Sequence, residues 1–167
     1  MIESSFAALS PQDSALHNSY LTVKIGDQLF GFPTKELRDI FKPVEITPIP
    51  LASNAILGSI NLRGRIVTVI DLRLKLYPNL DINNRPAMHI AVINGAELLS
   101  FVVDSVGEVI NIKENQFDPL PSTLESSWKN IADGVFQLDS ELLIKINMTH
   151  LLNLIATDDH RSGDKHS

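Results

Sequence analysis

The sequence predicts a mainly β fold made of two similar five-stranded barrels of the SH3-like or OB-like type, with a few short helices. Three observations point to this fold class. Short apolar segments are separated by turn residues rather than joined into long helices. The order of these segments recurs in the second half of the chain. The chain is 44% hydrophobic and has no cysteine, so a packed core rather than a disulfide framework must stabilise it.

The first predicted element is a β-hairpin. Its strands run from Tyr20 to Ile25 and from Gln28 to Phe32, with Gly26 and Asp27 in the turn. Glycine suits this turn because it tolerates a positive φ. A helix is predicted next, over Pro33 to Phe41, because apolar residues recur there at helical spacing and a proline follows.

A second hairpin closes the first half of the chain. It consists of Ile56 to Leu62, a turn at Arg63 and Gly64, and the apolar strand Arg65 to Ile70. Asp71 then has the side chain of a helix N-cap, which predicts a short helix over residues 72–77.

The second half predicts the same order of elements. Asn94 and Gly95 give the strongest short-range hairpin signal in the chain. The expected strands are Ala87 to Ile93, Glu97 to Val103, Val106 to Ile112, Ile131 to Leu138 and Glu141 to Ile146, followed by a capped helix from Met148.

Direct superposition supports an internal repeat. Residues 58–76 lie on residues 134–152 without a gap, so that apolar strand positions, turns and the caps Asp71 and Asn147 coincide. The leading hairpins also align, Gly26 on Gly95, at a slightly different offset. Each half is expected to form a five-stranded antiparallel sheet that closes on itself to remove its edges. The expected folded unit is 20–156, with subdomains at about 20–80 and 81–156.

The two ends of the chain predict flexible tails. Residues 1–19 lack periodicity and residues 157–167 are wholly polar, so burial cannot offset the entropy of ordering them. The N-terminal segment has no basic and apolar regions of a secretory signal, and no apolar run approaches the roughly 20 residues that span a bilayer. A cytoplasmic location is therefore expected.

Charge and motifs argue against nucleic-acid binding and catalysis. The net charge of -6 would repel a phosphate backbone. The usual nucleophile, zinc and phosphate-loop motifs are missing, and His89 and His150 have no carboxylate or hydroxyl at a catalytic spacing. The Asp and His residues of the tail offer no preorganised metal geometry. We therefore predict a protein that is not an enzyme, with no metal and no cofactor.

Four segments occur in a specific order: YLTVKIGDQLFGFPTKELRDI, ITPIP, GSINLRGRIVTVIDLR and FVVDSVGEVI. Together they resemble the CheW family, the coupling proteins of bacterial chemotaxis. The most specific part is N-L-R-G, then six intervening residues, then D-L. The resemblance spans Tyr20 to Leu154 and implies two intertwined five-stranded β-barrels with a non-catalytic adaptor function.

The resemblance also implies two partners. Proteins of this family bridge the cytoplasmic tip of a methyl-accepting chemoreceptor to the regulatory domain of a CheA-type histidine kinase, itself a two-barrel relative. The receptor tip is expected along an apolar seam between the barrels, where a turn residue such as Arg63 can present its planar guanidinium. Carried over by motif, the residues facing that seam would be Leu37, Asp39, Ile40, Gly58, Arg63, Val103 and Val106.

The kinase is expected to pack on barrel ends, with Ala87, Met88 and His89 taking part. The adaptor would then be recruited from the cytoplasm to membrane-associated receptor arrays, in which self-association is an open possibility. Two alternatives stay open. One is a coupler of a pilus-motility or other chemosensory-like pathway. The other is a small β-barrel nucleic-acid or ligand-binding module, for which one Trp and two Tyr offer few stacking surfaces.

Overall fold

The computed structural model describes the backbone of residues 18–50, 55–122 and 127–164, and the side chains within these ranges except for 127 and 157–164. Most of the expected N-terminal tail, residues 1–17, lies outside the described residues. The expected C-terminal tail is partly wrong, because the last helix continues to Asp164. Among the described residues, no helix is long and apolar enough to cross a membrane.

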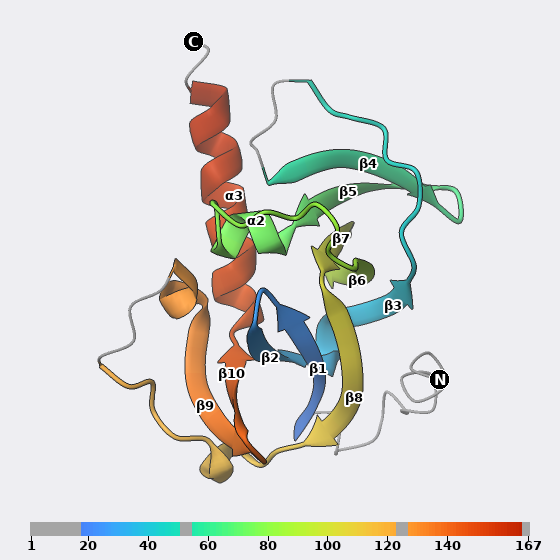
Figure 1. Ribbon diagram of the computed structural model, residues 1–167. Coiled ribbons are helices and arrows are strands. Elements are labelled where there is room, and N and C mark those ends of the chain that lie inside the picture. The colour runs from blue at the N-terminus through green and yellow to red at the C-terminus, as the bar shows by residue number, and fades with distance from the viewer. Residues whose placement is uncertain (1–17, 51–54, 123–126, 165–167) are drawn as a thin grey trace.

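Ten strands and two α-helices are found in the described ranges, joined by short 3-10 turns (Figure 1). The predicted hairpins and caps are confirmed, with strand ends within one or two residues of expectation. In chain order the elements are β1 (Ser19–Ile25), β2 (Gln28–Pro33), η2 (Thr34–Glu36), β3 (Leu37–Phe41), β4 (Ile56–Leu62), β5 (Arg65–Asp71), α2 (Leu72–Leu76), β6 (Met88–Asn94), β7 (Glu97–Val103), β8 (Ser105–Asn111), η3 (Glu114–Gln116), η4 (Ser127–Ile131), β9 (Ala132–Leu138), β10 (Glu141–Ile146) and α3 (Met148–Asp164).

The strands form two five-stranded sheets that exchange segments. Sheet A has the order β8-β1-β2-β10-β9, and sheet B has the order β3-β6-β7-β5-β4. The intertwined arrangement is therefore present, and the consecutive subdomains 20–80 and 81–156 do not correspond to the two sheets. The expected all-antiparallel pairing is also wrong, because β5 pairs parallel with β7 and β10 pairs parallel with β2. Each parallel pair joins strands of different repeats, which no hairpin turn can connect.

The internal repeat explains this topology. An offset of 69 residues relates β1 and β2 to β6 and β7, and an offset of 76 residues relates β4 and β5 to β9 and β10. Each sheet thus combines the leading hairpin of one repeat with three strands of the other. The two halves of the chain cannot separate without breaking both sheets.

Each sheet has one isolated β-bridge that adds a further backbone contact at an edge strand and helps the sheet curve toward a barrel. The chain after β3 returns to β4 through Thr47 and Ser59, which exchange two backbone hydrogen bonds of 2.8 Å. The chain after β8 returns to β9 in the same way, through Asp118 and Val135 at 2.8 and 2.9 Å. These bridges cover edge strands that would otherwise expose unpaired backbone groups.

Three apolar clusters fill the molecule. The largest takes side chains from both sheets and both helices, including Phe32, Phe101 and Leu151, and lies where the sheets meet. Two smaller clusters fill the other face of each sheet, around Leu143 in sheet A and around Val67 in sheet B. The expected apolar seam between the barrels is therefore filled by a packed core.

The predicted helix over 33–41 is wrong, because most of it forms strand β3. The pairing of β3 with β6 shifts register between Leu37 and Asp39, which is the signature of a β-bulge. The extra residue places Leu37 and Ile40 on the same buried side although they are three positions apart. The β-bulge thus accounts for the three-residue spacing of Leu37 and Ile40, which in the sequence resembled the spacing of a helix.

We predict that Gly58→Ala destabilises the fold far more than Gly134→Ala, its equivalent in the other repeat. Gly58 has a φ of 147°, and an added Cβ would lie 2.0 Å from the Thr47 carbonyl oxygen. The same atom at Gly134 would lie 3.4 Å from the nearest atom. Strain and clash together should cost about 3 kcal/mol or more at Gly58, against about 1 kcal/mol or less at Gly134. Urea unfolding of both variants measures this, and equal costs would contradict it.

Candidate functional site

The β4–β5 turn presents Arg63 to solvent. Arg63 and Gly64 both have positive φ, at 52° and 84°, as a two-residue turn between strands requires. The Asn61 side-chain oxygen accepts a 2.9 Å hydrogen bond from the Gly64 N–H and holds the turn in this shape. The Arg63 side chain is 85% exposed. The prediction that it is displayed rather than buried is confirmed.

Arg63 lies beside Asp39, another of the predicted receptor-facing residues. The Arg63 Nη2 atom is 3.5 Å from the Asp39 Oδ2 atom, and the Asp39 side chain is 25% exposed. Because β3 and β4 are the two opposite edge strands of sheet B, this ion pair joins one edge of the sheet to the turn that follows the other. An exposed pair of this kind contributes about 0–1 kcal/mol, so a partner can displace it at little cost.

The other five predicted groove residues are buried or half-buried. Leu37, Ile40 and Val103 are buried in the core between the sheets. Gly58 is buried against Thr47, and Val106 is half-buried on the edge strand β8. Of the seven residues, the structure brings Arg63 and Asp39 together at the surface and leaves Val106 accessible on the other sheet.

The predicted kinase-facing residues lie where strand β6 begins: Ala87 directly precedes the strand, and Met88 and His89 are its first two residues. Ala87 and Met88 are half-buried, whereas the His89 side chain is inside. Its Nδ1 atom is 2.9 Å from the Ser100 hydroxyl, and its ring stacks on Phe41 at 4.9 Å between centroids. Burial lowers the pKa of His89 below the ordinary histidine value; Asp71 opposes this shift and Arg73 adds to it. His89 is therefore enclosed, whereas Ala87 and Met88 keep part of their surface exposed.

A buried charge cluster lies at the crossing between the sheets, and sequence reasoning missed it. The Arg73 guanidinium donates to both oxygens of Asp71, at 3.0 and 2.8 Å, and is 3.4 Å from Asp104. Arg85 donates to the second oxygen of Asp104 at 3.1 Å. The hydrogen bond to Asp71 is the main cause that raises the pKa of Arg73. A charged residue directly after an apolar strand, as in FVVDS, was the available signal.

This cluster fixes the place where the chain passes from one sheet to the other. Asp104 follows β7 of sheet B, and its N–H donates to the Lys24 carbonyl of sheet A at 3.0 Å. Arg73 also donates to the Pro86 carbonyl at 3.0 Å, which anchors the loop before β6. Loss of one partner would leave a buried charge unpaired, at a cost of about 3–5 kcal/mol. The cluster therefore positions the start of β6 relative to both sheets.

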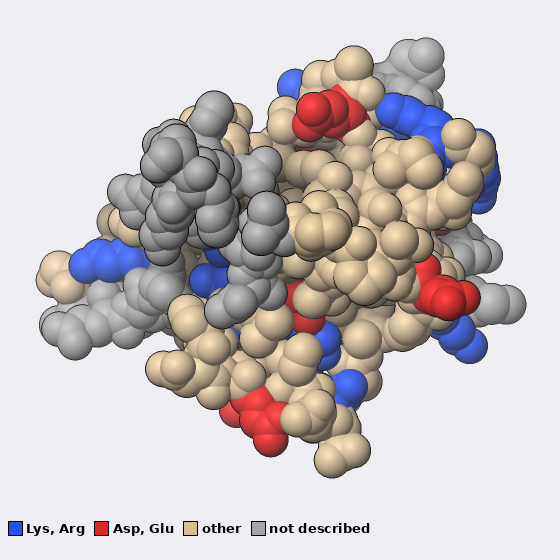
Figure 2. Space-filling model, turned by 90° about the horizontal axis from the view of Figure 1, so that it is seen from above, with Lys and Arg blue, Asp and Glu red and all other residues tan. Residues whose placement is uncertain are grey.

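The described side chains contain no group of three or more His, Cys, Asp and Glu residues that could hold a metal ion. The acidic and histidine residues of 158–166 lie outside the described side chains. On the face shown in Figure 2, Lys and Arg side chains occur at separate places with acidic side chains among them rather than as one basic field.

A family comparison decides the identity. The model of the CheW-like domain matches residues 19–156. The chain belongs to the CheW-like domain family. Its CheW relatives include the "Chemotaxis protein CheW" of Helicobacter pylori, 30% identical over 128 residues, which are 77% of each chain. The protein of the same name in Thermotoga maritima is 27% identical over 139 residues, covering 83% of this chain and 90% of the relative.

A solved CheW structure has the same architecture. The crystal structure of the scaffolding protein TtCheW from Thermoanaerobacter tengcongensis superposes with a TM-score of 0.68 at 28% sequence identity. The match covers 77% of this chain and 88% of that one. The fold class and family inferred from the sequence are therefore confirmed.

We predict that His89→Phe weakens the acid sensitivity of the fold. The folded state disfavours His89 protonation, so this residue contributes stability above the unfolded pKa of about 6.5 that is lost as pH falls toward the lower folded value. The variant leaves the Ser100 hydroxyl unpaired, which costs about 1–3 kcal/mol at every pH. The free energy of unfolding, measured from pH 7.5 to pH 5, should fall less steeply in the variant. Parallel curves for the two proteins would contradict this.

Proposed function

We propose that this chain is a non-catalytic adaptor that couples methyl-accepting chemoreceptors to a CheA-type histidine kinase in bacterial chemotaxis. The observation that carries the proposal is the CheW-like match over residues 19–156, which includes both sheets. The adaptor would work in the cytoplasm, at membrane-associated receptor arrays. Binding alone accounts for this role, since a bridge needs two surfaces and no reacting group.

The receptor surface is proposed at the margin of the seam, around Arg63 and Asp39. A receptor tip is a helical hairpin, which needs apolar contact and a few charges that fix its register. The exposed guanidinium of Arg63 can bind a carboxylate or a carbonyl pair once it leaves Asp39. Val106 would add apolar contact from sheet A, while Leu37, Ile40, Gly58 and Val103 shape this surface from beneath.

The kinase surface is proposed at the start of β6. Ala87 and Met88 are accessible there, and His89 supports them from inside through its contacts with Phe41 and Ser100. The Arg73–Asp104 cluster anchors the loop that leads into this strand. Placing the two surfaces on separate elements lets the adaptor hold both partners at once.

We predict that Arg63→Glu weakens receptor coupling and leaves the fold intact. Reversing an exposed charge at a turn changes stability little, whereas a central arginine of an interface contributes strongly to binding. Receptor capture in a pull-down and kinase stimulation in reconstituted arrays should both fall about tenfold or more.

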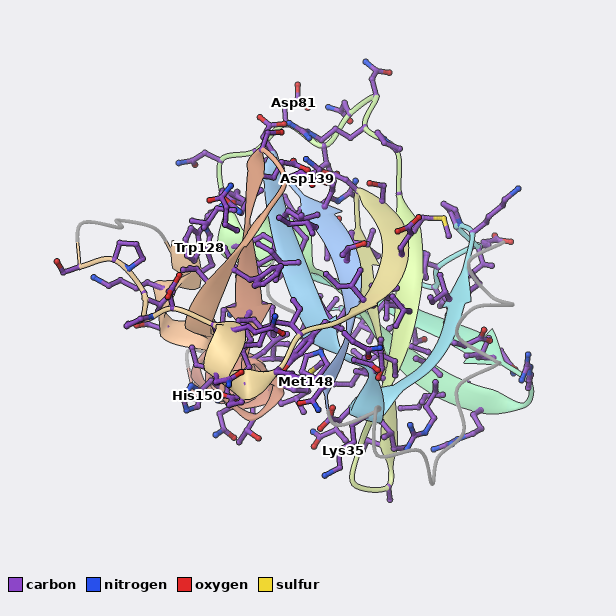
Figure 3. The ribbon with its side chains drawn as sticks, turned by 90° about the horizontal axis from the view of Figure 1, so that it is seen from below. Lys35, Asp81, Trp128, Asp139, Met148 and His150 are labelled. Atoms are coloured by element: carbon purple, nitrogen blue, oxygen red, sulfur yellow. The ribbon has the colours of Figure 1, made fainter. Side chains whose placement is uncertain are left out.

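The matched control is Asp139→Arg, at the equivalent turn of the other repeat. Figure 3 shows Asp139 at the tip of the β9–β10 hairpin, and its φ of 51° matches the 52° that arginine already adopts at position 63. The control also reverses one exposed charge, so it should retain receptor capture. Unchanged capture and stimulation by the Arg63 variant, or equal losses in both variants, would refute the assignment.

A further inference from the structure

The β6–β7 turn contains Asn94 and Gly95 and lies outside both proposed binding surfaces. Asn94 pairs with Glu97 across the hairpin, so the turn itself consists of Gly95 and Ala96. All four residues are exposed. Gly95 has a φ of 62°, and apart from its chain neighbours no heavy atom lies within 4 Å of where its Cβ would be. Water therefore reaches the Asn94–Gly95 peptide freely.

Two polar groups of this turn have no hydrogen-bond partner among the described residues: the Asn94 side-chain amide and the Gly95 N–H. The β4–β5 turn differs in this respect, because its Gly64 N–H donates to the Asn61 side-chain oxygen at 2.9 Å. Such a bond holds an asparagine side chain and a neighbouring backbone nitrogen in fixed positions. The amide of Asn94 and the nitrogen of Gly95 are free to approach each other instead.

The residue after Asn94 favours a reaction between these two groups. Asn94 is the only asparagine of the chain that is followed by glycine. Glycine has no Cβ to shield its backbone nitrogen or to restrict its dihedral angles. Attack of that nitrogen on the Asn94 Cγ atom closes a five-membered ring, and an intramolecular reaction of this kind has a high effective concentration of its reactants.

We propose that Asn94 is a site of spontaneous deamidation, with the Gly95 backbone nitrogen as the nucleophile. The nitrogen forms a bond to the Asn94 Cγ atom, the Cγ–Nδ2 bond breaks, and Nδ2 leaves as ammonia with the proton that Gly95 loses. Water then opens the succinimide ring at either carbonyl, which leaves aspartate or isoaspartate at position 94. Only water is consumed, and nothing is oxidised or reduced. The proposal goes beyond the adaptor function, because it assigns covalent chemistry to a turn that no partner is proposed to contact.

The two products differ in their effect on the hairpin. Both add a carboxylate near Glu97 and near Arg65, whose Nη2 atom donates to the Ala96 carbonyl at 2.9 Å. Isoaspartate also inserts one carbon, a bond of about 1.5 Å, into the main chain. The strands on either side of the turn are paired in a fixed register, so this longer chain does not fit between Asn94 and Glu97. We expect the aspartate form to keep the hairpin and the isoaspartate form to loosen its end.

The test incubates the folded full chain in heavy-oxygen water and maps the converted sites by proteolysis and mass spectrometry. Asn94 should convert at least about tenfold faster than Asn83, which is also exposed but is followed by Asn84. The rate should rise with pH, because attack requires the Gly95 nitrogen to lose its proton. No conversion at Asn94, or a rate no higher than that of Asn83, would overturn the proposal.

The matched variant is Asn94→Gln, which keeps the amide but must close a larger and less favourable ring. It should lose at least about nine-tenths of the acidic form that the natural chain develops on ageing, as measured by anion exchange. The isoaspartate form of the natural chain should melt at a lower temperature than Asn94→Asp, which adds the charge without lengthening the main chain. An aged Asn94→Gln chain that becomes acidic as fast as the natural chain would place the reaction elsewhere and refute the assignment.

Discussion

The shared core between the two sheets is the constraint on which the rest of the structure depends. Each sheet takes its leading hairpin from one repeat and its other strands from the second, so neither is complete alone. The largest apolar cluster draws side chains from both sheets and from both helices. Burial of about 25 cal/mol per Å² of apolar surface at this junction holds the repeats together. Exposed features such as Arg63 are therefore fixed relative to Val106 on the other sheet by a common interior.

Much of the fold could be predicted because local signals agreed with the final structure. The turn at Gly26 and the Asp71 cap depend on residues close in sequence, and the repeat follows from laying one half of the sequence on the other. Strand exchange could not be predicted from the same signals, since parallel pairing between repeats leaves no local pattern. The helix expected over 33–41 failed for a related reason: a β-bulge gave Leu37 and Ile40 a helical spacing. Long-range pairing, rather than propensity, decided that segment.

The candidate site was predictable in part. Exposure of Arg63 followed from its place in a tight turn beside glycine. Its contact with Asp39 could not be predicted, because it depends on the two edge strands of sheet B, β3 and β4, lying close together in the fold. Family resemblance named seven groove residues without separating those at the surface from those in the core. Leu37, Ile40 and Val103 hold the surface in shape from within. The Arg73–Asp104 cluster joins residues 31 positions apart and has no local motif. The features that could not be predicted are thus those set by burial and by contacts between residues far apart in the sequence.

The pairing of β2 with β10 has a consequence for synthesis on the ribosome. All strands of sheet B lie within residues 37–103, so that sheet has its full set before β8 emerges. The β1–β2 hairpin leaves the tunnel first, yet its parallel neighbour begins only at Glu141. At about 5–20 residues per second, the hairpin waits roughly 5–20 seconds with an unpaired edge. Chain entry order therefore leaves the β2 edge of the N-terminal hairpin unpaired until β10 emerges, although β8 can pair with β1 earlier. An unpaired strand edge of this kind exposes a nascent protein to aggregation.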